Sequence, residues 1–331
     1  MDWSFGLRIL LPLCYVVLVL VVIRNLAVLS TTDCSTPANV AKRITTEVEQ
    51  LYPPNTSRSI SNESDSGHLS KAQRLPDCII IGVRKGGTRA LLDAVALHPQ
   101  VRIVRHEVHF FDVNQTYNKG LEWYRSQMPV VADAQVTIEK TPAYFTNVLA
   151  PQRVYKMNPN LKLILIIREP VSRAISDYTQ VLCIRLEQNK SLNSFENEAF
   201  LADGTTVNTD YKPVRNSLYA VHMKQWLKYF PLKNFLIIDG DKFTRKPLPE
   251  LRRVERFLHL TTSIRSDQLV YDPSKHFFCF RRRTTAKIKC LGNSKGRPHA
   301  NVSERTKMFL RKNFAPYNEE FFHLVNRRWF W

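Results

Sequence analysis

The chain has 331 residues, and its 48 lysines and arginines against 29 aspartates and glutamates give a formal net charge of +19. An apolar fraction of 44% with only 10 glycines excludes collagen-like and low-complexity classes and indicates a globular protein. The charge is concentrated late in the chain, because residues 273–331 hold 14 basic and 3 acidic side chains. Such a field attracts an anion, whether nucleic acid, anionic lipid or a sulfated polysaccharide.

An aliphatic segment near the N-terminus predicts insertion into a membrane. Its uninterrupted apolar run of 15 residues is short for a span of about 20. The run becomes long enough if it continues to Leu29 and the Arg24 side chain snorkels to the membrane surface. We therefore expect a cytoplasmic tail over residues 1–8 and a signal-anchor transmembrane helix over residues 9–29. A cleaved signal peptide is the alternative that this pattern leaves open.

Both interpretations place the remainder of the chain in the secretory lumen, where nucleic acid is not available as a partner. Residues 30–75 are rich in serine, threonine and asparagine without apolar periodicity, which predicts a flexible lumenal stem. Residues 76–331 then form one domain, near the upper size for a single core. Five N-x-Ser/Thr sequons support a lumenal location and predict N-glycosylation. They are at Asn55, Asn62, Asn114, Asn189 and Asn301.

A strand, a glycine-rich loop and a helix follow one another at the start of this domain. The apolar run from Cys78 to Val83 is typical of a buried parallel strand, and a helical pattern begins at Ala90. Residues 84–89 between them read Arg-Lys-Gly-Gly-Thr-Arg, a composition suited to an anion nest at a helix N-terminus. An ordinary strand-to-helix turn is the alternative. Thr88 stands where a Walker A motif has its lysine, which argues against metal-dependent phosphoryl transfer.

A second strand-to-helix junction has the same character. The aliphatic run from Leu161 to Ile167 is followed by Arg168, and Ser176 lies on the next predicted helix. Ligands of open α/β sheets bind beyond the carboxyl ends of the strands. Two anion sites on neighbouring strands predict a ligand with two separated phosphates, although an ion pair and a surface hydroxyl would explain the same residues. We expect an α/β fold with a central, mainly parallel sheet and helices on both faces.

Three segments together resemble the nucleotide-binding segments of the Golgi heparan sulfate glucosamine 3-O-sulfotransferases. The resemblance extends from about Leu75 to Trp329 and includes the segments from Arg105 to Asp112 and from Ile138 to Pro142. The three segments are Lys85-Gly86-Gly87-Thr88-Arg89, Arg168 with Ser176, and Lys295-Gly296-Arg297 with His299.

The resemblance implies 3′-phosphoadenosine 5′-phosphosulfate (PAPS) as the sulfuryl donor. The loop from Lys85 to Arg89 would hold the 5′-phosphosulfate, and Arg168 with Ser176 the 3′-phosphate. The late loop from Lys295 to His299 would close over the donor. It contains Pro298 where relatives have another residue, which removes a backbone N–H. The implied donor-binding residues are Lys85, Gly86, Gly87, Thr88, Arg89, Arg168, Ser176, Phe278, Lys295, Gly296, Arg297, Pro298 and His299.

The same resemblance implies that Glu107 is the catalytic base. A carboxylate near a sugar hydroxyl can take its proton as the new O–S bond forms. Lys85 would neutralise charge on the leaving phosphate, while Lys140 and His109 would flank Glu107 and orient it. No metal is required, because the His106-Glu107-Val108-His109 sequence is one residue short of the zinc-binding H-E-x-x-H spacing. A solvated surface acid is the alternative role for Glu107.

The acceptor would be the glucosamine 3-hydroxyl of heparan sulfate, bound along a cleft. Trp226 is open to a second interpretation, because an aromatic residue on a helix usually belongs to the core. The matched acceptor residues are Glu107, Val108, His109, Phe110, Phe111, Asp112, Lys140, Thr141, Pro142, Ala143, Asp177, Gln180 and Trp226. The resemblance further implies a Golgi, single-pass type II membrane protein. Two alternatives are a heparan sulfate sulfotransferase acting at another position, such as the glucosamine nitrogen, and a non-catalytic heparan sulfate-binding protein.

The six cysteines of a lumenal chain permit disulfides. We expect a bridge between Cys279 and Cys290, a pair that matches the family. The other four cysteines, Cys14, Cys34, Cys78 and Cys183, are expected not to pair with one another.

Overall fold

The computed structural model describes residues 71–282, 287–292 and 295–331. The predicted cytoplasmic tail, the signal-anchor helix and nearly all of the stem lie outside the described residues, as do the sequons at Asn55 and Asn62. None of the helices within the described ranges is both long and apolar enough to cross a membrane. Residues 71–75, the predicted end of the stem, are ordered: β1 (Lys71–Gln73) pairs antiparallel with β4 (Val130–Ala132). Regular structure therefore begins a few residues earlier than the sequence suggested.

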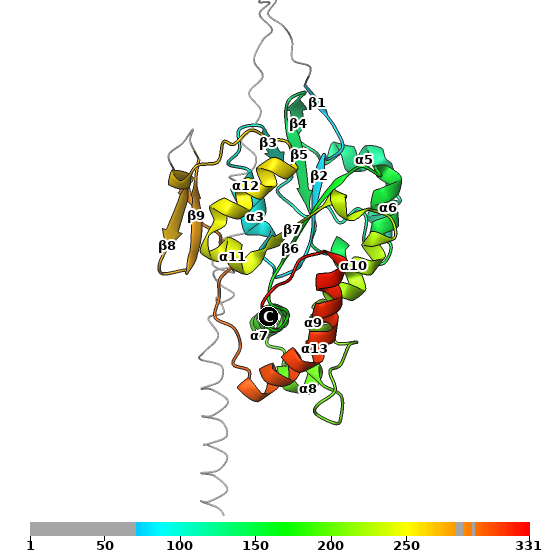
Figure 1. Ribbon diagram of the computed structural model, residues 1–331, viewed down its shortest axis with the longest axis vertical. Coiled ribbons are helices and arrows are strands. Elements are labelled where there is room, and N and C mark those ends of the chain that lie inside the picture. The colour runs from blue at the N-terminus through cyan, green and yellow to red at the C-terminus, as the bar shows by residue number, and fades with distance from the viewer. Residues whose placement is uncertain (1–70, 283–286, 293–294) are drawn as a thin grey trace, which may run out of the picture.

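A five-stranded sheet with the strand order β3-β5-β2-β6-β7 forms the centre of the molecule (Figure 1). Every neighbouring pair is parallel. Strands β2, β6 and β7 are mostly aliphatic and buried on both faces, as is typical of parallel strands, whereas β3 and β5 also carry polar side chains. The predicted central parallel sheet is confirmed. Its strands are β2 (Cys78–Gly82), β3 (Val101–Ile103), β5 (Val136–Lys140), β6 (Lys162–Ile167) and β7 (Phe235–Asp239).

Helices cover both faces of this sheet because successive strand side chains point to opposite sides (Figure 1). Ile80 and Ile164 pack with α3 (Thr88–Val95), α11 (Gly240–Arg245) and α12 (Pro247–Phe257). Their neighbours Ile79 and Leu163 join a second core on the other face. The helices of that face are α5 (Gly120–Ser126), α6 (Ala150–Met157), α10 (Tyr219–Leu227) and the C-terminal part of α13 (Glu304–Leu324).

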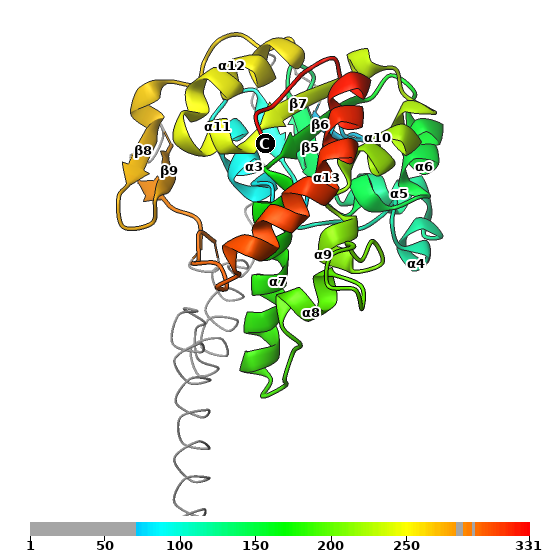
Figure 2. The same ribbon diagram turned by 60° about the horizontal axis from the view of Figure 1, so that its bottom comes forward.

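A third, smaller core extends the domain beyond the carboxyl ends of the strands (Figure 2). It joins α7 (Pro170–Glu187), α8 (Phe195–Ala199) and α9 (Lys212–Arg215) to the N-terminal part of α13. The long helix α7 begins three residues after β6 ends, so its first turns lie at the sheet edge where ligands bind in α/β folds.

A small antiparallel sheet, β10-β9-β8, stands beside the α11–α12 layer. Its disulfide joins Cys279 to Cys290 across a Cα–Cα distance of 4.3 Å, which confirms the expected bridge. Cys78 is a free buried thiol. Cys183 is disulfide-bonded, and because Cys279 and Cys290 pair with each other, the expectation that the other four cysteines do not pair with one another is wrong. The strands are β8 (Leu269–Asp272), β9 (Phe277–Arg281) and β10 (Ile288–Lys289), and the remaining short elements are α4 (Asn114–Tyr117) and the 3-10 helices η1 (Tyr144–Thr146), η2 (Leu232–Asn234) and η3 (Ser266–Gln268).

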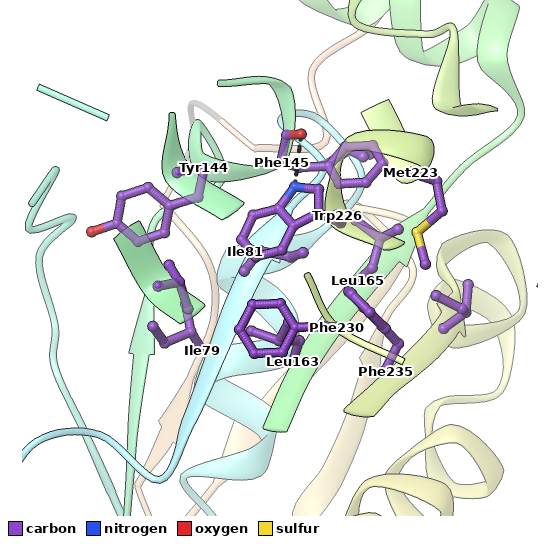
Figure 3. Close-up of a cluster of buried hydrophobic side chains, with 14 of the residues drawn as sticks. Ile79, Ile81, Tyr144, Phe145, Leu163, Leu165, Met223, Trp226, Phe230 and Phe235 are labelled. Atoms are coloured by element: carbon purple, nitrogen blue, oxygen red, sulfur yellow. Dashed lines mark hydrogen bonds between the residues drawn. The ribbon is translucent and has the colours of Figure 1, made fainter. Parts of the chain in front are cut away.

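Trp226 belongs to the core and not to a surface cleft (Figure 3). The side chain is 0% exposed and packs near Phe230 and Phe235 of the α10 face. Its indole Nε1–H donates to the carbonyl of Phe145 at 3.1 Å, which satisfies its one polar group. Of the two roles that the sequence left open for Trp226, the core role is correct, because a fully buried ring cannot contact an acceptor.

Candidate active site

The glycine-rich loop packs tightly against the carboxyl end of β6. The Val83 N–H donates to the Ile166 carbonyl at 2.9 Å, and the Gly86 N–H donates to the Val83 carbonyl at 2.9 Å. A Cβ on Gly86 would lie 2.5 Å from the Ile166 oxygen, so only glycine fits there. Gly87 has φ +106° and caps α3, a conformation that other residues rarely adopt. The predicted strand, loop and helix are present, and both glycines are required by the path of the backbone itself.

Several cations converge on this loop and repel one another. The pKa of Lys85 falls to about 8, first because the ammonium is buried and then because Lys295 and Arg297 are close. Burial and the charge of Lys140 lower the pKa of Lys295 as well. The pKa of His299 drops to about 4 through burial and the charges of Arg168 and Lys85, so this imidazole is neutral at pH 7. Positive charges held together in a partly buried space create a site for a multiply charged anion. We call Lys85, Arg168, Lys295 and Arg297 the cation cluster.

A buried ion-pair network fixes the loop to α7. Asp177 accepts from Arg84 Nε at 2.6 Å with one carboxylate oxygen and pairs with Arg173 Nη1 at 3.0 Å with the other. Arg173 is fully buried and also donates to the Arg84 carbonyl at 3.2 Å. Burial alone would raise the pKa of Asp177, but the two guanidinium groups hold it below its ordinary value. The Asp177 side chain is only 4% exposed, so it braces the loop and is not free to contact an acceptor as predicted.

Sequence reasoning missed Arg173 entirely. A signal was present, because Arg173 precedes Asp177 by four residues on a helix, the spacing at which opposite charges meet. The neighbouring Gln180, one turn further along α7, accepts from Lys85 Nζ at 3.3 Å. Gln180 therefore lies beside the cation cluster, as the sequence placed it in the site.

The second junction also lies at the site. Arg168 is held through its guanidinium by Asp241, with Nε 3.5 Å from Oδ1, and through its carbonyl by the Tyr219 hydroxyl at 2.8 Å. Asp241 additionally accepts from the Glu169 N–H at 3.1 Å. Ser176 is nearly buried in the second turn of α7. The carboxyl ends of β2 and β6, which are neighbours in the sheet, thus bring the two groups of predicted anion-binding residues to one edge of the sheet.

The late loop reaches the site from the disulfide-bonded sheet. Gly296 has φ +70°, and a Cβ there would lie 2.7 Å from the Phe277 ring. The Ala300 N–H donates to the buried Thr179 Oγ1 on α7 at 2.9 Å, which anchors the loop directly after Pro298 and His299. Phe278 packs against the α11–α12 core and is half-buried.

Glu107 stands at the centre of a second charged group. It forms an ion pair with Lys140 Nζ through Oε1, and its Oε2 lies 3.5 Å from His109 Nε2. The other ring nitrogen, His109 Nδ1, lies 2.8 Å from Asp112 Oδ2. The Lys140 side chain is 4% exposed whereas that of Glu107 is 40% exposed, so a buried ammonium orients a carboxylate that solvent or substrate can reach.

The other predicted acceptor residues lie mostly inside the protein. Phe110 and Phe111 are 1% and 0% exposed and pack on Tyr124, the first stacked and the second edge to face. Their side chains are core residues, and the prediction of acceptor contacts through them is wrong. Val108, Thr141 and Pro142 are also buried, while Ala143 is half-buried. The sequons at Asn114, Asn189 and Asn301 are exposed.

Comparison with known proteins identifies the family. A sulfotransferase domain model matches residues 75–330. Heparan sulfate glucosamine 3-O-sulfotransferase 5 from Homo sapiens is 46% identical over 282 residues, which cover 83% of this chain and 81% of that protein. The chain belongs to the heparan sulfate glucosamine 3-O-sulfotransferase family. Heparan sulfate glucosamine 3-O-sulfotransferase 6 from Mus musculus is 41% identical over 260 residues, 78% of this chain and 74% of that protein.

A solved structure supports the fold of this family member. A sulfotransferase from Alicyclobacillus acidocaldarius superposes with a TM-score of 0.57 at 18% identity, covering 77% of this chain and 98% of that one. At this identity the likeness concerns the fold alone. The α/β sulfotransferase fold that the sequence resemblance implied is confirmed.

Proposed function

We propose that this sulfotransferase transfers a sulfuryl group from PAPS to the 3-hydroxyl of glucosamine residues in heparan sulfate. The observation that carries the proposal is the position of Glu107, a reachable carboxylate beside the cation cluster. Lys295 links the two groups electrostatically, because the charges of Lys140, Glu107 and Arg297 all act on its ammonium. The carboxylate of Glu107 suits a nucleophile that must lose a proton. The neighbouring cation cluster suits a leaving group that gains negative charge.

The donor fits the anion-binding residues in number and arrangement. The glycine-rich loop with Lys85, Thr88 and Arg89 would hold the 5′-phosphosulfate at the start of α3, where backbone N–H groups face the ligand. Arg168 and Ser176 would hold the 3′-phosphate at the next strand. The buried ammonium of Lys85 would stabilise the charge that develops on the departing phosphate. The late loop would cover the donor with Lys295, Gly296, Arg297 and His299. Phe278 would lie near the adenosine of the donor.

The reaction follows from the placement of Glu107. Its carboxylate takes the proton of the sugar hydroxyl while the hydroxyl oxygen forms a bond to sulfur, and the bond between sulfur and the donor phosphate oxygen breaks in line. Lys140 and His109 hold the carboxylate in place from two sides. Asp112 fixes the opposite nitrogen of the His109 ring, a relay that orients the imidazole.

Disaccharide mapping tests this function and separates it from its alternatives. The purified full-length protein is incubated with labelled PAPS and heparan sulfate, and the product is digested and analysed. We expect label in 3-O-sulfated disaccharides. Label found only as N-sulfate would favour the related activity at the glucosamine nitrogen. Binding of heparan sulfate without label transfer would identify a non-catalytic binder.

We further propose that the protein resides in the Golgi membrane as a single-pass type II protein with a lumenal, glycosylated domain. The N-terminal apolar segment supports this, and so does the bridge between Cys279 and Cys290, since disulfides persist in oxidising compartments. Protease protection of the domain in sealed Golgi vesicles, with a mobility shift after glycosidase treatment, would support the proposal. Digestion of the domain in sealed vesicles would contradict it.

A further inference from the structure

A buried carboxyl, that of Glu139, lies close to the loop that carries Glu107 and His109. It has no part in the chemistry described so far. Glu139 is the fourth residue of β5, next to Lys140, and is 0% exposed. Because side chains alternate along a strand, Glu139 and Lys140 point to opposite faces of the sheet. Burying a carboxyl costs free energy, and an apolar side chain of similar size would be the more stabilising choice. The hydrogen bonds of Glu139 suggest a reason for a carboxyl at this buried position.

Glu139 belongs to a set of polar contacts that ends on the backbone of the catalytic loop. Thr141 Oγ1 donates to Glu139 Oε1 and accepts from the Val108 N–H at 3.1 Å. The Tyr144 hydroxyl accepts from the Phe110 N–H at 3.0 Å. These two N–H groups flank His109, and Val108 directly follows Glu107, so the contacts fix the backbone between the base and its histidine neighbour.

We propose that Glu139, Thr141 and Tyr144 form a buried clamp that holds the loop carrying Glu107 and His109 in its catalytic geometry. Glu139 is then a positioning residue for sulfuryl transfer, since its carboxyl orients the Thr141 hydroxyl whose lone pair receives the Val108 N–H. The proposal depends on the proposed function through the role of Glu107. A displacement of about 1 Å in a catalytic group can cost a hundredfold in rate, so a modest loosening of this loop has a large effect on turnover.

Glutamine is a conservative replacement for Glu139. Burial raises the pKa of Glu139 to about 8, so the carboxyl is largely neutral at pH 7. Glutamine has the same shape and also keeps an oxygen that accepts from Thr141. Leucine has a similar volume but no acceptor. A third variant, Tyr144→Phe, removes only the hydroxyl that receives the Phe110 N–H and is the milder change.

The experiment compares full-length Glu139→Leu, Glu139→Gln and Tyr144→Phe proteins with the wild type. We expect Glu139→Leu to lower kcat about tenfold or more, with the KM for PAPS changed less than about twofold. Glu139→Gln should restore kcat to within about threefold of the wild type, and Tyr144→Phe should lower it at least about threefold. Amide hydrogen exchange at residues 108–110 should accelerate in Glu139→Leu and Tyr144→Phe but not in Glu139→Gln.

Glu255→Gln is the matched control. Glu255 is a buried carboxylate on α12, on the opposite side of the sheet, and it accepts two backbone N–H groups directly, from Ser263 at 2.9 Å and Ile264 at 2.8 Å. This variant should lower the thermal midpoint with kcat within about twofold of wild type.

Two outcomes would overturn the clamp. The first is a kcat within about twofold of wild type in both Glu139→Leu and Tyr144→Phe, and the second is an equal loss of kcat in Glu255→Gln, which would reduce the effect to general destabilisation. Should Glu139→Leu fail to fold, Tyr144→Phe decides alone. A wild-type protein without 3-O-sulfated product would instead contradict the proposed function, and the exchange of the amides at 108–110 would still test the clamp.

Discussion

At the scale of single residues, the site depends on two charged side chains, Glu107 and Lys85, and on the charged groups that surround each of them. Glu107 is reachable only on one side, since Lys140 and His109 occupy its other contacts. Lys85 is a half-buried ammonium among other cations, and the nearby carboxylate of Asp177 offsets their charge only in part, because the pKa of Lys85 remains lowered to about 8. These two residues have separate tasks, and substitutions should affect turnover and donor binding separately.

Glu107→Gln should abolish most turnover and leave donor binding nearly intact. Glutamine keeps the shape of the side chain but cannot take a proton, and general base catalysis typically contributes about a hundredfold to ten-thousandfold. The measurements are kcat with heparan sulfate and the dissociation constant, by calorimetry, of 3′-phosphoadenosine 5′-phosphate (PAP), the nucleotide that remains after PAPS gives up its sulfuryl group. A large loss of nucleotide affinity in this variant would count against the assignment of Glu107 as base.

Donor affinity should weaken as the pH rises through about 8. Lys85 has a pKa of about 8 without the donor, and a bound phosphate favours its charged form, so binding takes up a proton once Lys85 is deprotonated. The PAP dissociation constant should rise by up to roughly tenfold per pH unit above 8, with a contribution from Lys295, whose pKa is lowered too. Lys85→Arg, which remains charged, should flatten the profile. An unchanged slope in that variant would show that Lys85 is not the titrating group.

At the scale of elements, the sequence predicted the parts that local patterns encode. The aliphatic runs before Arg84 and Arg168 are β2 and β6, and the helix patterns that follow are α3 and α7. Buried parallel strands are recognisable because both of their faces are apolar. Contacts between distant segments were not predictable, since no local pattern shows that Asp177 meets Arg84 or that Thr141 meets the backbone of residue 108.

The family resemblance named several residues that do meet in the structure but did not say which way each side chain points. Glu107, Lys140 and His109 do meet, and Lys85 lies with Lys295 and Arg297. The side chains of Phe110, Phe111 and Trp226 instead serve the core. A matched motif identifies a segment, whereas burial of its individual side chains depends on the helices that pack on the sheet from elsewhere in the chain.

Asp177 joins α7 to the glycine-rich loop through its ion pairs with Arg173 and Arg84. Asp177→Ala would leave the buried Arg173 and its neighbour Arg84 without their shared carboxylate, and loss of one partner from a buried ion pair typically costs about 3–5 kcal/mol. We expect a lower free energy of unfolding in urea and a weaker affinity for PAP, because the loop loses its support. A variant of normal stability with only a raised KM for heparan sulfate would restore the acceptor role that the sequence suggested.

At the scale of the whole molecule, the positive charge serves two tasks in two kinds of environment. The cation cluster gathers where the glycine-rich loop, α7 and the late loop meet. Lys85, Arg168 and Arg297 are half-buried there and Lys295 is exposed, and we propose that together they bind the small donor. The basic residues of the disulfide-bonded sheet and of α13 are exposed and spread over a broad surface, as suits a sulfated chain. They include Arg282, Lys287, Lys289, Arg305, Arg311 and Lys312.

Salt should therefore weaken acceptor binding much more than donor binding. The Debye length shrinks from about 10 Å at 0.1 M ionic strength to about 3 Å at 1 M, which screens exposed charges strongly and buried ones little. We expect the KM for heparan sulfate to rise several-fold over this range while the dissociation constant of PAP changes far less. Replacing Arg282, Lys287 and Lys289 together by alanine should reduce the salt dependence of the KM, since these side chains are exposed. Equal salt sensitivity of the two affinities would show that one charged surface serves both ligands.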